Sequence, residues 1–197
     1  MLTVSDPLPE HPQRILIAGV SGAGKSTLAR RLAALLGIEY TELDSLFHGP
    51  NWVPRAEFMN DVDHLTQEPT WVSEWQYAAV RRLLAQRADI LIWLDYPMPV
   101  SMVRLIRRTV RRRSQREELW NSNYEGPLWG IFTDSDHIIR WGWRTRNKLK
   151  VLVPTLEEKF PGLRVVRLRS PREADVWLGR LAERVSASRV QPRQDQP

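Results

Sequence analysis

The sequence contains no cysteine, and this absence excludes several kinds of chemistry at once. Disulfides, thiolate zinc sites, iron–sulfur clusters and thiol nucleophiles all require that side chain. No apolar run approaches the roughly 20 residues that span a bilayer. Residues 1–13 are rich in proline and acids, whereas a signal peptide is basic and then apolar. We therefore expect a cytoplasmic protein without a membrane partner.

The remaining composition is that of a globular protein, with 42% hydrophobic and 26% charged residues. The 197 residues suit one domain, because domains usually contain roughly 100 to 200 residues. We expect this single domain at residues 14–185, a flexible N-terminal tail at 1–13 and a disordered tail at 186–197.

The positive charge is concentrated in one quarter of the chain. Residues 101–150 hold 12 Lys and Arg against 5 Asp and Glu, while the whole chain has a net charge of +6. This excess suits a partner that carries phosphates, either a nucleotide or a nucleic-acid backbone. A solvated basic helix face explains it equally well, so charge alone does not choose between them.

Short apolar runs alternate with helical patterns along the chain. Strands are predicted at 14–19, 38–43, 71–73, 88–94 and 163–168. Helices are predicted at about 28–36, after Pro54, and at about 76–86, 99–113, 136–159 and 171–185, with an aperiodic loop or lid at 114–131. This alternation predicts an α/β fold with a parallel sheet covered on both faces, which binds ligands at the carboxyl ends of its strands.

The segment from Gly19 to Ser26 fits the pattern G-x-x-x-x-G-K-[ST], between the first predicted strand and a predicted helix. Glycines let successive backbone N–H groups surround an anion, and the helix N-terminus adds a partial positive charge. Lys25 can reach the β and γ phosphates, and Ser26 offers its hydroxyl to Mg²⁺. The residues expected to hold ATP here are Gly19, Ser21, Gly22, Ala23, Gly24, Lys25, Ser26 and Thr27.

A phosphate loop does not by itself distinguish kinases from GTPases and motor ATPases. A GTPase is expected to carry an Asn/Thr-Lys-x-Asp motif, but Asn147-Lys148 is followed by Leu149-Lys150. The chain is also too short for the helical subdomain of most ring ATPases. These observations favour a small kinase.

Further motifs occur between about Arg14 and Leu181. They are Glu42 to Trp52, Trp71 to Tyr77, Trp93 to Pro97, an arginine-rich helix followed by Glu117 to Asn121, and Arg167 to Pro171. With the phosphate loop, they resemble the adenylate-kinase-like small P-loop kinases, and more narrowly a bacterial branch labelled topology modulation proteins. The resemblance implies a nucleoside-monophosphate-kinase-like P-loop NTPase with a five-stranded parallel sheet of order 2-3-1-4-5, an acceptor region after the second strand and a short lid at about 112–132.

The resemblance also implies roles for individual residues. Asp44 matches the acid that faces the acceptor hydroxyl, and Glu74 matches the acid that holds magnesium through water. Arg81, or Arg82 in its place, matches an arginine that clamps the acceptor's phosphate or another anion, and a surface role is the alternative for either. Arg104 and Arg108 match lid arginines, of which one stacks on adenine and the other neutralises the charge of the γ-phosphate.

Several of these roles have structural alternatives. Asp44 is otherwise a cap or turn residue, and Asp95 caps the turn after its strand or binds metal. His48 and Trp52 are candidates for contact with the acceptor, although a lone histidine in an aromatic loop is more often structural. The last motif assigns Arg169 to the nucleotide.

The chain departs from the branch at one motif, where acid-Gly-Asn-Tyr is replaced by residues 74–77, Glu-Trp-Gln-Tyr. A tryptophan at position 75 forbids close backbone approach and easy positive φ, so we expect an effect on acceptor size or turnover. Trp93 and Trp177 fall in core-like patterns. The tryptophans expected to line a pocket or lid are Trp52, Trp75, Trp120, Trp129, Trp141 and Trp143.

Three functions follow from these observations. The first is a magnesium-dependent kinase that moves the γ-phosphate of ATP to a nucleoside monophosphate or another hydroxylated metabolite. The second is a nucleic-acid-associated ATPase or polynucleotide kinase, which is less favoured because the triphosphate of ATP already accounts for the arginines. The third is a nucleotide-sensing regulatory protein with little turnover.

Overall fold

A single parallel sheet forms the centre of the molecule, in a computed structural model that describes residues 1–8, 12–124, 143–145 and 147–190. The strand order is β2-β3-β1-β4-β5, as the resemblance implied. The strands are β1 (Arg14–Gly19), β2 (Tyr40–Thr41), β3 (Trp71–Glu74), β4 (Ile90–Leu94) and β5 (Arg164–Leu168).

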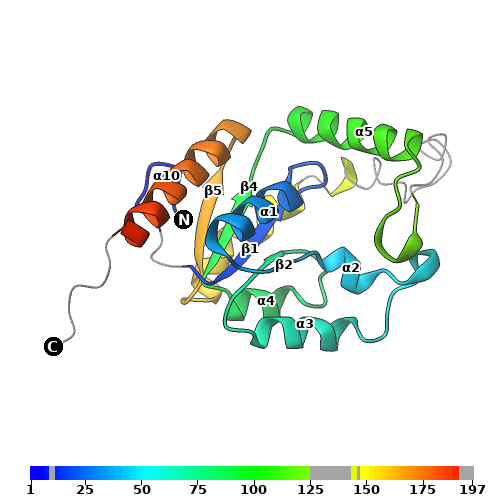
Figure 1. Cartoon of the computed structure of the whole chain (residues 1–197), viewed down its shortest axis with the longest axis horizontal. Helices are drawn as coiled ribbons and strands as arrows, with labels where there is room; N and C mark the ends of the chain where they lie inside the picture. Colours follow the sequence, from blue (N-terminus) through cyan, green and yellow to red (C-terminus); the bar gives the residue numbers. More distant parts are fainter. Residues whose placement is uncertain (9–11, 125–142, 146, 191–197) are drawn as a thin grey trace.

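Helices cover both faces of this sheet (Figure 1). The described helices are α1 (Lys25–Leu36), α2 (Leu43–Phe47), α3 (Phe58–Gln67), α4 (Arg81–Arg87), α5 (Met98–Ser114), α8 (Lys148–Leu152), α9 (Leu156–Lys159) and α10 (Pro171–Val190). Three 3₁₀ turns join them, η1 (Pro50–Trp52), η2 (Trp120–Ser122) and η3 (Val153–Thr155). No helix in these described ranges is long and apolar enough to cross a membrane.

The alternation of side chains along β1 divides the core in two. Ile15 and Ile17 pack with residues of α1 and α10, whereas Leu16 and Ala18 pack on the opposite face with residues of α3, α4 and α9. All four are fully buried. A strand that is apolar on both faces is typical of a parallel sheet between two helical layers, and it fixes the phosphate loop at its carboxyl end.

Several helices have other bounds than the sequence pattern predicts. The helix expected from Gln76 begins only at Arg81, because Tyr77 has a left-handed backbone with φ of 57°. The helix expected at about 136–159 is divided at its C-terminal end into α8, η3 and α9, where Pro154 cannot donate a helical hydrogen bond. Its first part, 136–142, lies outside the described residues.

The ends of the chain also differ from the prediction of two loose tails. Leu2 forms a parallel bridge with Val166, and its N–H donates to the carbonyl of Val165 at 2.7 Å. Arg180 of α10 donates to the carbonyls of Val4 and Asp6. Residues 1–8 therefore cover the edge of β5, and α10 continues to Val190 instead of ending near 185. Residues 9–11 and 191–197 lie outside the described part.

Candidate active site

The phosphate loop folds tightly because two of its glycines have left-handed backbones. Gly22 has φ of 80° and Gly24 has φ of 100°. A Cβ on Gly22 would lie 2.2 Å from the carbonyl oxygen of Ser101, so the loop packs directly against α5. α1 begins at Lys25 without a side-chain cap, so its first N–H groups have no capping side chain and suit an anion.

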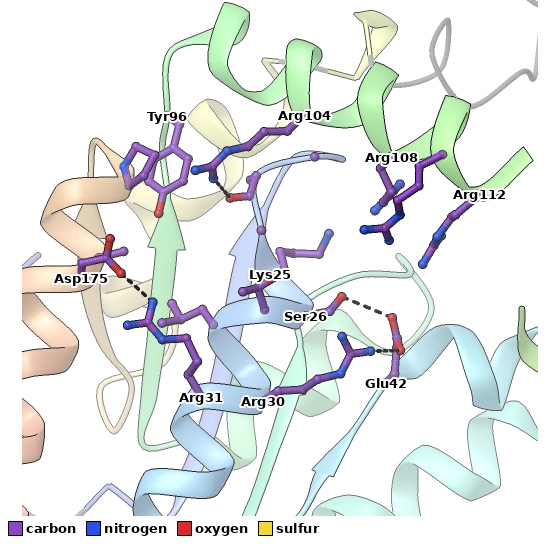
Figure 2. Close-up of a pocket in the computed structure, with 18 residues that line it drawn as sticks. Lys25, Ser26, Arg30, Arg31, Glu42, Tyr96, Arg104, Arg108, Arg112 and Asp175 are labelled. Carbon is purple, nitrogen blue, oxygen red and sulfur yellow. Dashed lines mark hydrogen bonds and ion pairs between the residues drawn. The ribbon is translucent and has the colours of Figure 1, made fainter. Parts of the chain in front are cut away.

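A cavity of about 500 Å³ lies between this loop and α5. Figure 2 shows Arg104, Arg108 and Arg112 directed from α5 toward the loop, facing Arg30 on α1. The lining residues are Gly22 to Leu28, Arg30, Arg31, Glu42, Tyr96, Arg104, Arg108, Arg111, Arg112, Pro171, Ala174 and Asp175. Gly19 and Ser21 belong to the loop but are not among these residues. The cavity thus combines backbone N–H groups with a cluster of cations, which suits a polyphosphate.

Two carboxylates converge on the hydroxyl of Ser26. Its Oγ donates to Glu74 Oε1 at 2.7 Å and lies 3.2 Å from Glu42 Oε1. Glu74, at the end of β3, is 2% exposed and also lies 3.6 Å from Lys25 Nζ. Tyr40 donates its phenolic hydrogen to Glu74 Oε1 at 3.0 Å. These oxygens are of the type that Mg²⁺ prefers, so the residues fit a magnesium ion beside the phosphate loop.

The crowding of acids changes the ionisation of this cluster. Burial raises the pKa of Glu42, and the charges of Glu74 and Asp44 raise it further. A hydrogen bond from Trp120 and the charge of Arg30 lower the pKa, but by less. Burial and the charges of Glu74 and Glu42 also raise the pKa of Tyr40 far above its ordinary value. The acids therefore repel one another in the absence of a cation, as expected for a site that receives one.

Asp44 lies in the first turn of α2, where the sequence pattern predicted the end of a strand. Its Oδ1 accepts from Gln76 Nε2 at 2.7 Å and from the hydroxyl of Tyr77 at 2.5 Å. The same hydroxyl lies 3.2 Å from His48 Nε2. Burial lowers the pKa of His48. The charge of Asp44 and a hydrogen bond with the backbone of Trp52 raise this pKa, but by less. The carboxylate of Asp44 caps no helix and instead ends a chain of hydrogen bonds that runs through Tyr77 to His48.

Aromatic rings surround that chain. Tyr77 stacks on Phe47 with ring centroids 4.2 Å apart. The ring of His48 lies 5.0 Å from that of Trp52 and 6.2 Å from that of Trp120. His48 thus lies beside Tyr77, Trp52 and Trp120, the last of which comes from the segment after α5, and the predicted contact of His48 and Trp52 with an acceptor stays a prediction.

Two turns of similar shape bring these rings together, the η1 turn (48–54) and the η2 turn (118–124). In each, two successive residues have a positive φ between 55° and 62°, and an antiparallel bridge joins the ends. Asn123, only 3% exposed, connects the turns, since it donates to the carbonyl of Gly49 and accepts from the N–H of Trp52, both at 2.9 Å. Asn121 donates to the carbonyl of His48. This part of the expected lid is therefore docked on the loop after α2.

Trp75 corrects one expectation from the sequence. Its side chain is buried at 4% exposure, and its indole N–H donates to the carbonyl of Arg81 at 3.0 Å. Trp75 is a core residue and does not line the cavity beside the phosphate loop. The residue of this segment that has a positive φ is Tyr77. The guanidinium of Arg81 lies 5.2 Å from the Trp75 ring centroid, and burial lowers its pKa. Trp93 and Trp177 are core residues as predicted, Trp143 is exposed, and Trp129 and Trp141 lie outside the described residues.

The arginines assigned to the nucleotide separate into two places. Arg104 and Arg108 line the main cavity, and Arg104 also donates to the carbonyl of Ala23 at 3.4 Å. Arg169 lines a second, more open cavity of about 470 Å³ at the ends of β4 and β5. Asp95, in that second cavity, accepts two hydrogen bonds from Arg167, and its side chain makes no cap hydrogen bond to α5.

The sequence prediction assigned no role to Glu42, Gln76 or Tyr77. Glu42 precedes Asp44 by two residues, at the edge of the sheet where the phosphate loop lies, and this position was the available signal. Gln76 and Tyr77 meet Asp44 only through packing of α2 against the segment after β3, for which the sequence carries no local pattern.

Comparisons with known proteins agree with this geometry. No family model matches the chain. A shikimate kinase from Halorhodospira halophila is 29% identical over 147 residues, which is 66% of this chain and 80% of that protein. A bifunctional pantoate ligase/cytidylate kinase from Gloeobacter violaceus is 41% identical over 59 residues, 28% of this chain but only 12% of that protein.

The fold has a solved counterpart, a shikimate kinase from Acinetobacter baumannii in complex with shikimate. It is 18% identical, with a TM-score of 0.52, and the match covers 92% of this chain and 97% of that one. The sheet order, the phosphate loop and these relatives define the class of this protein, an ATP-dependent P-loop kinase. Within that class it is similar to kinases of small molecules, and the narrower resemblance to topology modulation proteins stays a prediction.

Proposed function

We propose that this kinase moves the γ-phosphate of ATP, bound with Mg²⁺, to a hydroxyl group of a small metabolite. The observation that carries the proposal is the placement of three acids at one edge of the sheet. Glu42 and Glu74 meet the phosphate-loop hydroxyl of Ser26, and Asp44 lies on the next turn of chain. Two acids thus serve the nucleotide and its metal, and a third is available to an acceptor.

The residues divide the work of phosphoryl transfer among them. Lys25, the loop N–H groups, Arg104 and Arg108 bind the phosphates, while Ser26, Glu42 and Glu74 hold the metal. Mg²⁺, when bound, neutralises charge on the β and γ phosphates. Arg169 lies near the nucleotide only if the base extends toward the second cavity.

Asp44 serves the acceptor in this proposal. The acceptor oxygen forms a bond to the γ-phosphorus, the bond from that phosphorus to the β–γ bridging oxygen breaks, and ADP leaves. The hydroxyl proton passes to Asp44, which mainly aligns the hydroxyl, since phosphoryl transfer depends on position and charge neutralisation.

Arg81, His48 and Trp52 complete the proposed acceptor site. Arg81 is half-buried, and its Nε has no hydrogen-bond partner among the described residues. A guanidinium in this state suits an anionic group of the acceptor. The rings of His48 and Trp52 supply an apolar wall. A hydroxylated carboxylic or phosphorylated metabolite fits this set, and shikimate, named in two of the relatives, is the first compound to test.

The test is ATP consumption by the purified protein with Mg²⁺, with three pools of acceptors. The pools are hydroxylated acids including shikimate and gluconate, nucleoside monophosphates, and single-stranded oligonucleotides. We expect turnover that one of the first two pools stimulates and that EDTA abolishes. Stimulation by oligonucleotides alone would support a polynucleotide kinase instead. ATP binding without stimulation by any pool would support a nucleotide sensor.

A further inference from the structure

Within the part of the chain that the structure describes, the carboxylate of Asp44 is hydrogen-bonded at one oxygen only. Gln76 and Tyr77 both donate to Oδ1, at 2.7 and 2.5 Å. The described residues place no hydrogen-bond donor on Oδ2. An ionised carboxylate accepts at both oxygens, so the unused oxygen is the one available to a hydroxyl that enters the site.

Tyr77 makes this contact from a left-handed backbone. Its φ of 57° lies in the left-handed region, which costs a side chain other than glycine free energy. Stacking on Phe47 at 4.2 Å and an edge contact with Phe58 at 5.2 Å hold the ring in place. Strain that the surrounding packing maintains is typical of functional sites.

The direction of the hydrogen bonds follows from the chemistry of the acceptor. An ionised carboxylate only accepts, so the hydroxyl hydrogen of Tyr77 points to Asp44. The tyrosine oxygen then accepts from His48, whose Nε2 lies 3.2 Å away and must carry the hydrogen. His48 thereby fixes the rotation of the Tyr77 hydroxyl.

We propose that Gln76 and Tyr77 are positioning residues that occupy Oδ1 of Asp44 and so present Oδ2 to the acceptor hydroxyl, with His48 orienting Tyr77. This inference rests on the proposed function, because it assigns Asp44 to the acceptor. The inference also gives a reason for the departure of segment 74–77 from the related branch. Trp75 fills the core, and the side chain of Gln76, which is longer than the asparagine of that branch, reaches Asp44.

The first experiment observes the hydrogen bond without catalysis. We expect a slowly exchanging hydroxyl proton at low field in the ¹H NMR spectrum of the wild-type protein. It should disappear in Tyr77→Phe and shift upfield in Asp44→Asn, whereas the exposed Tyr124→Phe should leave it unchanged. Nitrogen shifts should show His48 as the neutral Nε2–H form. Absence of the proton from the wild-type spectrum would overturn the proposal.

The second experiment measures whether these residues act through Asp44. With the acceptor identified by the pools above, we expect Tyr77→Phe and Gln76→Met each to lower kcat about tenfold, with the KM for ATP and the Tm unchanged. In the Asp44→Asn background the same substitutions should lower kcat less than twofold. Equal losses in both backgrounds would overturn the proposal.

The two experiments keep the inference apart from the proposed function. A wild-type protein that shows the low-field proton but phosphorylates no acceptor would contradict the proposed function. The hydrogen bond would then exist, but the inference that it presents Oδ2 to an acceptor would be wrong as well. A protein that phosphorylates an acceptor but lacks the proton, or loses activity equally in both backgrounds, would contradict the inference alone.

Discussion

The proposed nucleotide side and the proposed acceptor side of the active site differ in how many of their polar groups are already hydrogen-bonded within the chain. On the nucleotide side, arginines of α5 and N–H groups of the phosphate loop line an open cavity of about 500 Å³. On the acceptor side, Asp44, Tyr77 and His48 are hydrogen-bonded to one another, and Asn123 joins the two turns beside them. The first side is built to receive many negative charges, and the second to hold one carboxylate in one orientation.

This difference indicates that specificity for the acceptor arises on the acceptor side. Backbone N–H groups and cations bind any triphosphate in much the same manner, because the phosphate group is common to all of them. A carboxylate fixed at a single atom accepts only a hydroxyl that reaches that atom. Substitutions on the nucleotide side should therefore affect every acceptor alike, whereas those on the acceptor side should leave ATP binding intact.

The largest expected effect is on the nucleotide side, in Lys25→Ala. Loss of the cation that reaches the β and γ phosphates should lower phosphoryl transfer by about 10³-fold. Steady-state ATP consumption with the identified acceptor measures this loss, and the exposed Lys159→Ala is the matched control. Residual activity within a factor of three of wild type would contradict the assignment of the loop.

Asp44→Asn tests whether the two sides are separable. We expect kcat to fall about 10²-fold, since positioned acid–base groups contribute at least that much. The dissociation constant for ATP, measured by calorimetry, should stay within a factor of two. Glu68→Gln, at an exposed acid directly after α3, is the control. If ATP binding weakened as strongly as turnover, the division into two sides would be wrong.

Asn123→Ala should act on the acceptor side more weakly. Its side chain is buried and bonded to both turns, so truncation leaves the carbonyl of Gly49 and the N–H of Trp52 without a partner. An unsatisfied buried group costs about 1 to 3 kcal/mol. We expect the KM for the acceptor to rise about tenfold with an unchanged KM for ATP, and the exposed Asn147→Ala to change neither. A rise in the KM for ATP instead would place the η2 turn on the nucleotide side.

The smallest expected effect is on thermal stability, where Glu42→Gln should stabilise the metal-free protein. The pKa of Glu42 is raised in the folded state, so its ionisation opposes folding, and stability is lost as the pH rises through that pKa. Removal of the charge should raise the Tm at pH 8 by about 2 °C, since about 1 kcal/mol shifts the Tm of a chain of this size by 2 to 4 °C.

The pH dependence of the Tm provides a control for the comparison of wild type with Glu42→Gln. The two proteins should converge below about pH 4, where the carboxyl group is protonated even when unfolded. Thermal melts with EDTA at several pH values measure this, with the exposed Glu158→Gln as the matched variant. An advantage that persists at low pH would show that packing, and not charge, separates the two proteins.

The same two sides differ in how well the sequence predicts them. The phosphate loop, α1 and the arginines of α5 are recognisable because their residues are neighbours along the chain, at the spacing of a tight loop or of helical turns. The sheet order was also predicted correctly, through the resemblance. On the acceptor side, Asp44 is 32 residues from Gln76, and Trp52 is 71 residues from Asn123. No local pattern records contacts at that separation, so the roles of Gln76, Tyr77 and Asn123 were missed.

Trp75 shows the converse error. The sequence analysis expected its side chain to line a pocket or lid and to affect acceptor size or turnover, because a glycine stands there in the branch that the chain resembles. In the folded chain its side chain turns into the core, and the neighbouring Tyr77 takes the left-handed backbone. A substitution beside a site changes that site only if the new side chain faces it.

The junction between the η1 and η2 turns has a consequence for the order of events in each catalytic cycle. Asn123 is hydrogen-bonded to both turns. If one turn moved without the other, these hydrogen bonds would break and leave buried polar groups without partners. In the proposed function, passage of the acceptor between Trp52 and Trp120 therefore requires the two turns to move together or to break the hydrogen bonds of Asn123. In the proposed reaction, the entry of the acceptor and the exit of its phosphorylated product are therefore the steps that this junction of two turns would slow.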